Sequence, residues 1–159
     1  MAVALDLSRE LGSGPGSSLE DSIRLAASLV RWALDASYPV YLLAPGAPHH
    51  PLSWYQAMDF LARAGVSTTP TFPDQLSLCP ESAELIILSP DVDRRTGEVL
   101  TAARRAGSTV VVALAGYGGS PAPLDAAWPS NTNTVICRPG DDLGQVGARA
   151  LLALQGAAR

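Results

Sequence analysis

Short apolar runs recur along this chain, separated by longer segments in which apolar residues follow helical spacing. The runs cover residues 2–7, 40–44, 84–88, 109–114 and 134–137. They lack the polar-apolar alternation of a strand with one solvent-facing side, so they predict strands that are buried on both faces.

Helical spacing fills most of the intervals between these predicted strands. It predicts helices over residues 19–36, 52–64, 94–106 and 142–154. In the first helix the apolar residues cover more than one face, which is typical of a largely buried helix. Strands that alternate with helices predict an α/β fold, here a three-layer, Rossmann-like, mostly parallel sheet with helices on both faces.

Three connecting segments carry weaker signals. Residues 66–71 are β-prone but polar, and nearby prolines make them a short edge strand or a loop. Residues 74–81 predict irregular structure or a single turn, and residues 115–133 predict a long loop rich in glycine, proline and serine. Gly65 and Gly107 directly follow predicted helices, and we expect them to act as C-caps.

The first predicted strand ends in side chains that carry oxygen. Asp6, Ser8 and Glu10 occupy alternate positions, which point the same way along an extended chain. An aspartate within an apolar strand is costly to bury unless it has a partner. Ser89 and Asp91 follow the central strand in a similar way. Because open α/β sheets bind ligands at the carboxyl ends of their strands, we expect a binding site at these five residues.

A glycine-rich loop, residues 12–16, leads from this site to the first helix. Ser17 and Glu20 have the spacing of a capping box at the start of that helix. Helix N-termini bind anions, but the glycine spacing is not that of a dinucleotide fingerprint and Pro15 interrupts it. We therefore expect a flexible loop here rather than a phosphate site.

Composition excludes several function classes. The length of 159 residues fits one domain, residues 1–159, and an apolar fraction of 47% suits a folded core. All 11 basic residues are arginines, so neither a P-loop lysine nor a Schiff-base lysine exists. The net charge of −4, without a basic stripe, argues against nucleic-acid binding.

Cysteines and histidines are few and do not have the spacing of a zinc site. We expect Cys79 and Cys137 to be buried thiols in a reducing, cytoplasmic compartment. His49 and His50 are interpreted as solvated loop residues. No apolar run in this sequence is long enough to cross a bilayer, and its first residues lack the charged-then-apolar pattern of a signal peptide. Met1 directly precedes a core strand, so we expect a domain excised from a longer protein.

Two further features have ordinary interpretations. The arginine pairs at 94–95 and 104–105 predict a solvated helix face, an ion-pair cluster with the adjacent Asp91 and Asp93, or a partner patch. Trp54, Tyr55 and Trp128 lie in or beside predicted loops, and we expect them to anchor the core rather than to form a docking surface.

The segment from Asp6 to Glu10, followed by a helix with Glu20 and the run Ala26-Ala27-Ser28-Leu29, resembles the von Willebrand factor A-like fold. More narrowly, it resembles the C-terminal part of the bacterial domain-of-unknown-function family fifty-eight. Ser89 after the central strand is similar to that family's Ser-Asp turn. The resemblance covers nearly the whole chain and implies that the first strand lies beside the central strand.

This resemblance also implies a function and a setting. Proteins of the family are often membrane-tethered and encoded beside MoxR-type AAA+ ATPases, with a proposed adaptor or assembly role and no established catalysis. The resemblance thus predicts a non-catalytic protein-interaction module whose partner is an AAA+ ATPase and whose parent chain is membrane-anchored. The alternative is a metal-assisted hydrolase or nucleotide-binding α/β domain that uses the same crevice, although no Gly-x-Ser-x-Gly elbow supports a hydrolase triad.

Von Willebrand A domains bind a divalent cation through Asp-x-Ser-x-Ser, a later threonine and an aspartate after the central strand. Asp6 and Ser8 match the first two positions, whereas Glu10 replaces the third serine. Pro90 stands where the aspartate belongs, and Asp91 or Asp93 from the next turns is the candidate substitute.

The resemblance thus implies a degenerate metal site at Asp6, Ser8 and Asp91. Mg²⁺ is the ion that such oxygen ligands would take, and we expect no other cofactor. No threonine in residues 45–51 completes the ligand set, and Ser53 is the nearest hydroxyl. The alternative is that Asp6 and Ser8 only hydrogen-bond to backbone amides of neighbouring loops.

Overall fold

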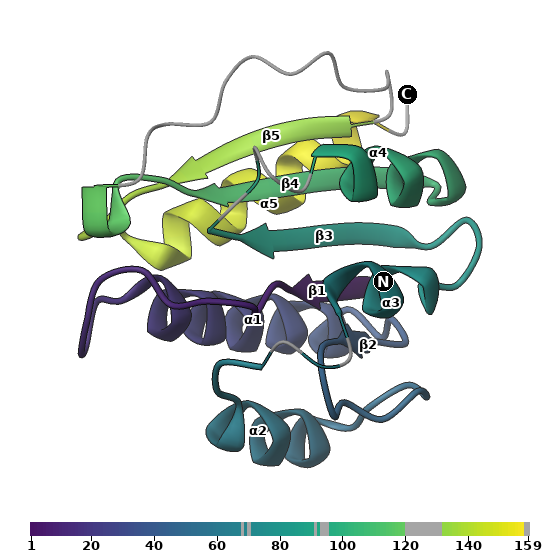
Figure 1. The fold of residues 1–159 in the computed structure, drawn as a ribbon. Coiled ribbons are helices and arrows are strands. Elements are labelled where there is room, and N and C mark those ends of the chain that lie inside the picture. Colours follow the sequence, from purple (N-terminus) through teal and green to yellow (C-terminus); the bar gives the residue numbers. More distant parts are fainter. Residues whose placement is uncertain (68, 70, 91, 93–95, 120–131, 158–159) are drawn as a thin grey trace.

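A five-stranded parallel sheet forms the middle layer of the molecule (Figure 1). The computed structural model describes residues 1–67, 69, 71–90, 92, 96–119 and 132–157. The strand order is β2-β1-β3-β4-β5, and every pairing is parallel. The strands are β1 (Ala2–Leu5), β2 (Tyr41–Leu43), β3 (Glu84–Ser89), β4 (Ser108–Leu114) and β5 (Thr132–Cys137).

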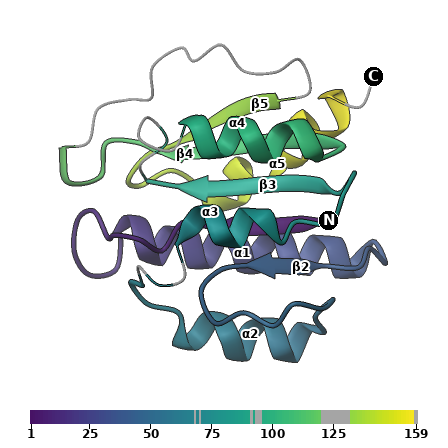
Figure 2. The same ribbon diagram turned by 45° about the vertical axis from the view of Figure 1, so that its right-hand side comes forward.

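Helices cover both faces of this sheet, which confirms the predicted three-layer α/β fold. They are α1 (Ser18–Asp35), α2 (Trp54–Arg63), α3 (Phe72–Ser77), α4 (Thr96–Arg105) and α5 (Leu143–Ala157), with a 3₁₀ turn η1 (Tyr117–Gly119) after β4. Figures 1 and 2 show α3 and α4 on one face and α1 and α5 on the other, with α2 packed beside α1.

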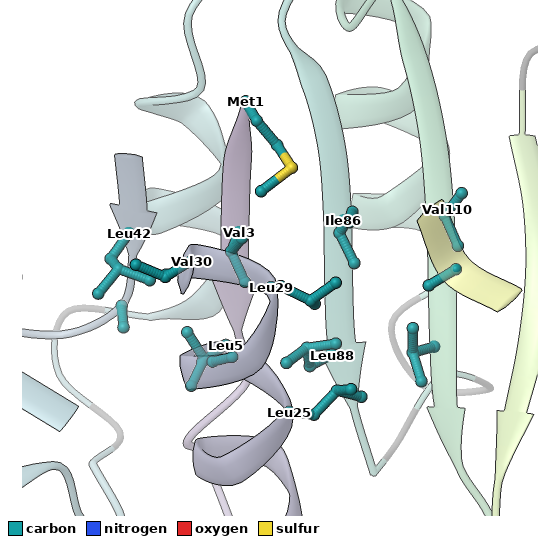
Figure 3. Close-up of a cluster of buried hydrophobic side chains, with 14 of the residues drawn as sticks. Met1, Val3, Leu5, Leu25, Leu29, Val30, Leu42, Ile86, Leu88 and Val110 are labelled. Carbon is teal, nitrogen blue, oxygen red and sulfur yellow. The ribbon is translucent and has the colours of Figure 1, made fainter. Parts of the chain in front are cut away.

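Two apolar clusters separate the layers, because alternate side chains of each strand enter opposite faces. Val3 and Leu5 of β1 pack with Leu25 and Leu29 of α1 on one face (Figure 3). The residue between them, Ala4, belongs to the cluster under α3 and α4. Both faces of β1 are therefore buried, and this explains why its sequence is a continuous apolar run.

The segment before β3 departs from its prediction. Residues 72–77 form α3, where irregular structure or a single turn was predicted for residues 74–81. Thr71 caps this helix, because its backbone N–H and its hydroxyl both donate to a carboxylate oxygen of Asp74, at 3.0 and 2.6 Å. The described part of residues 66–71 forms a loop and no strand.

Other boundaries shift by one to three residues. The first strand ends at Leu5, two residues earlier than predicted, and the last begins at Thr132, two residues earlier. The predicted helix over residues 94–106 is described from Thr96 to Arg105, and the pair 94–95 and Trp128 lie outside the described residues. Among the described helices, none combines the length and the apolar character that a membrane crossing requires.

Neither Gly65 nor Gly107 has the positive φ of a left-handed cap, so the prediction that they cap helices in that way is wrong. Gly107 is needed for a different reason. A Cβ at this position would lie 2.7 Å from the backbone oxygen of Ser82, which is closer than van der Waals contact allows. At Gly65 a Cβ would meet nothing within 4 Å.

We predict opposite effects for alanine at these two glycines. Gly107→Ala is expected to lower the free energy of unfolding by about 1–3 kcal/mol, because backbone must move to admit the methyl group. Gly65→Ala is expected to raise it by about 0.4–1 kcal/mol, since only the unfolded chain loses freedom. Urea unfolding of both variants measures this difference, and equal effects would contradict the close approach of Gly107 to Ser82.

Candidate functional site

The carboxylate of Asp6 joins the carboxyl ends of the two central strands. Ser89 directly follows Leu88, which pairs with Leu5. The Ser89 hydroxyl donates to Asp6 Oδ2 at 2.8 Å. The hydroxyl of Ser8 donates to Asp6 Oδ1 at 2.6 Å. The prediction that Asp6 and Ser89 meet at one edge of the sheet is therefore confirmed.

Burial makes this cluster different from a surface patch. Asp6 is 3% exposed and Ser89 is fully buried. The backbone N–H of Asp6 still pairs with Leu88 O at 2.9 Å, and the chain then turns so that Ser8 N–H donates to Asp6 Oδ1 at 3.2 Å. An aspartate that accepts from the amide two residues ahead is a common turn device. Asp6 thus does bind a backbone amide, that of Ser8.

Glu10 does not join this cluster. The alternation that would align Asp6, Ser8 and Glu10 requires extended chain, and the extended strand ends at Leu5. Glu10 is exposed and forms no hydrogen bond or ion pair with the described part of the chain. Asp91, the other predicted acidic member of the site, lies outside the described residues.

Two hydroxyls that sequence reasoning missed lie close to Ser8. Ser67 and Thr71 line a cavity of about 110 Å³ together with Ser8, Pro45 and Phe72. The backbone N–H of Ser67 donates to Leu7 O at 2.8 Å, which brings this loop against the exit of β1. A hydroxyl near the site was sought in residues 45–51, whereas the two that lie beside Ser8 come from the chain after α2. The polar, β-prone character of residues 66–71 was the available signal.

Hydrogen bonds fix the glycine-rich loop between the site and α1. Ser18 N–H donates to Leu11 O, and Leu11 N–H donates to the Ser18 hydroxyl, both at 2.8 Å. Ser17 caps α1 by accepting from Glu20 N–H at 3.2 Å. With these caps in place and with acidic residues in its first turn, this helix end does not favour a phosphate.

A second buried carboxylate ties α1 to the turn after β4. The hydroxyl of Tyr117 donates to Asp21 Oδ2 at 2.7 Å and lies 3.7 Å from the sulfur of Cys137. Burial, together with this hydrogen bond, raises the pKa of Tyr117 far above its usual range. Burial also raises the pKa of the Cys137 thiol. The Tyr117 hydroxyl and the Cys137 thiol therefore keep their protons at neutral pH.

The remaining candidate residues lie where their side chains have ordinary roles, with one exception. Cys79 and Cys137 are buried free thiols, as predicted, and both histidines are exposed. Trp54 packs at the edge of the core under the Arg31 guanidinium, which lies 5.4 Å from the ring centroid. Tyr55 is 83% exposed, so the prediction that it anchors the core is wrong.

The carboxylate and hydroxyl oxygens around Asp6 are the type of ligand that a hard cation prefers. A hydroxyl that donates its proton to a carboxylate keeps its lone pairs for another partner. Mg²⁺ is commonly held by one or two carboxylates and retains several waters, so a small protein ligand set is sufficient. Among the residues that the structure describes, however, no three carboxylate, imidazole or thiol side chains gather as a metal site.

Comparison with protein-family models, with curated proteins and with solved structures finds no match. The residues of the site and their geometry are therefore the evidence for what it can do.

We predict that the Asp6–Ser89 hydrogen bond stabilises the fold. Asp6→Ala leaves the buried Ser89 hydroxyl without this acceptor and is expected to lower the free energy of unfolding by about 1–3 kcal/mol. Adding Ser89→Ala is expected to cost less than the sum of the two single changes, because the pair is coupled. Asp35→Ala, which breaks an exposed ion pair, is the control and is expected to cost at most about 1 kcal/mol. Additive effects at positions 6 and 89 would contradict the bond.

We also predict an alkaline limit to stability that depends on Tyr117. Its folded pKa is raised, so its contribution is complete below the unfolded pKa of about 10 and is lost progressively as the pH rises above that value. Tyr117→Phe is expected to weaken the fold at pH 7, because Asp21 loses a donor, and to flatten the decline above about pH 10. Urea midpoints measured from neutral to alkaline pH test this, and an equally steep decline in the variant would refute it.

Proposed function

We propose that this chain is a non-catalytic protein-interaction module that docks its partner at the carboxyl end of the sheet. The supporting observation is the cluster of Asp6, Ser8 and Ser89, which joins the two central strands. Each of these hydroxyls donates its single proton to the buried Asp6 carboxylate, and Ser89 is itself buried out of reach of a substrate. The cluster is better suited to shaping a surface than to activating a nucleophile.

The docking surface in this proposal consists of Ser8, Glu10, Ser67 and Thr71, with the buried pair of Asp6 and Ser89 beneath it. The fixed backbone around Asp6 presents Ser8, which is half-buried, at the mouth of the small cavity. Glu10 adds an exposed negative charge beside it. Asp91 is part of the proposed surface on sequence grounds alone.

The resemblance to von Willebrand A-like domains of family fifty-eight names a partner. It favours an adaptor that works with a MoxR-type AAA+ ATPase, as one domain of a membrane-anchored parent protein. A Mg²⁺ ion, where present, would be held by Ser8, Asp6 and Asp91 and would supply positive charge for an acidic group of the partner. The alternative, a metal-assisted hydrolase or nucleotide-binding domain, would use the same crevice.

We predict that changing Ser8 and Glu10 together weakens partner binding without unfolding the domain. A purified MoxR-type AAA+ ATPase serves as the probe in a surface-binding titration, and Ser8→Ala with Glu10→Ala is expected to raise the dissociation constant about tenfold, or ~1.4 kcal/mol. Glu81→Ala, an exposed acid before β3 at the opposite end of the sheet, is the control and is expected to change nothing.

Calorimetry with MgCl₂, MnCl₂ and ATP separates the two functions. Cation binding that Ser8→Ala weakens, without nucleotide binding or turnover, is expected for the interaction module. Tight ATP binding, or hydrolysis that depends on the cation, would replace this proposal with the enzyme.

A further inference from the structure

A groove lies between α3 and α4, on the face of the sheet opposite to α1 and α5. Figure 2 shows α3 and α4 on the same face of the sheet, with β3 visible between them. The groove has a volume of about 500 Å³. Its walls include Leu76 and Ser77 of α3 and Gly97, Thr101 and Arg105 of α4.

Two of the α4 residues that line this groove, Gly97 and Thr101, have little or no side chain to fill it. Gly97, Thr101 and Arg105 follow one another at intervals of four residues and so form one stripe along α4. A Cβ built at Gly97 would meet nothing within 4 Å. The opposite wall is a helix of only six residues, and Leu78, directly after it, is 43% exposed. Pro73, Leu76 and Ala102 supply the apolar part of the groove's lining, and Ser77 and Thr101 add hydroxyls.

Arg105 places a positive charge at one end of this groove. It is exposed, and it forms no ion pair with any residue that the structure describes. The residue four positions earlier is Thr101, so α4 supplies no acid at that position. Arg104 beside it adds a second exposed charge in the last turn of α4, on a chain whose net charge is −4. Partly apolar walls that end in a guanidinium suit a partner with the complementary pattern.

We propose that this groove docks an amphipathic helix of a partner protein, with apolar side chains between α3 and α4 and an acidic side chain on Arg105. Helix-in-groove recognition uses apolar anchors at i, i+3 or i+4, and i+7, and the walls here are themselves two neighbouring helices. Guanidinium and carboxylate groups form paired, charge-assisted hydrogen bonds, which fix the direction of the docked helix. This inference is independent of the carboxyl-end site, because it uses different residues.

A set of three synthetic peptides tests the charge requirement. Each is an amphipathic helix of about four turns with a leucine stripe, and the residue one turn beyond the stripe is Glu, Gln or Lys. Fluorescence anisotropy is expected to rank binding to the wild-type chain as Glu, then Gln, then Lys, with about tenfold between the extremes. Arg105→Glu is expected to reverse this order. Equal binding of the three peptides, or an order that Arg105→Glu leaves unchanged, would overturn the proposal.

Gly97→Gln tests the groove itself. The longer side chain has room in the folded protein and suits a helix better than glycine, so the thermal midpoint is expected to rise while Glu-peptide binding falls at least several-fold. Gly156→Gln, at an exposed glycine of α5 with equal room, is the matched control and is expected to leave binding unchanged. Unchanged binding in Gly97→Gln would overturn the proposal.

Amide chemical shifts locate the bound probe. The Glu peptide is expected to shift the amides of Ser77, Thr101 and Arg105. Decanoate, added below its micelle concentration, is the second probe, because it has an apolar body and a carboxylate but no helix. Shifts of these amides by decanoate and not by the peptide would replace the partner helix with a small amphipathic acid and overturn the proposal.

Discussion

A carboxylate enclosed between parallel strands has to be hydrogen-bonded, and this requirement at Asp6 organises the centre of the molecule. Ser89 and Ser8 both donate to it, so the end of β3 and the exit of β1 are held at one point. The strand pairing places Leu5 opposite Leu88, and the bond from Ser89 follows directly from that register. The path of the chain after β1, and with it the exposure of Ser8 and Glu10, depends on this one buried group.

Asp21 is a second buried carboxylate that accepts a hydrogen bond from a distant hydroxyl, that of Tyr117. In both cases a hydroxyl donates to a carboxylate near the N-terminus, from the last residue of β3 in one case and from the turn after β4 in the other. Burial raises the cost of losing either bond, because each orphaned oxygen would remain away from water. These two bonds therefore help to specify how the connections lie against the core.

The sequence predicted the elements better than the surfaces that they form. Continuous apolar runs marked the strands because both faces of this sheet are covered, and Asp6 and Ser89 could be placed at one edge because parallel strands end together. Glu10 was misplaced, since alternation holds only while the chain stays extended. Ser67, Thr71 and the α3–α4 groove were not predicted, because loop paths and the spacing between helices arise from tertiary packing rather than from local pattern.

The bond between Ser89 and Asp6 spans 83 positions of the chain. Strand β1 is made first, yet it pairs on one side with β2 and on the other with β3. During synthesis β1 therefore lacks one of its two neighbouring strands until β3 has left the ribosome. Closing so long a loop is entropically costly and slows the folding of parallel sheets. The apolar edge of β1 is thus the segment of the nascent chain that most needs protection from aggregation.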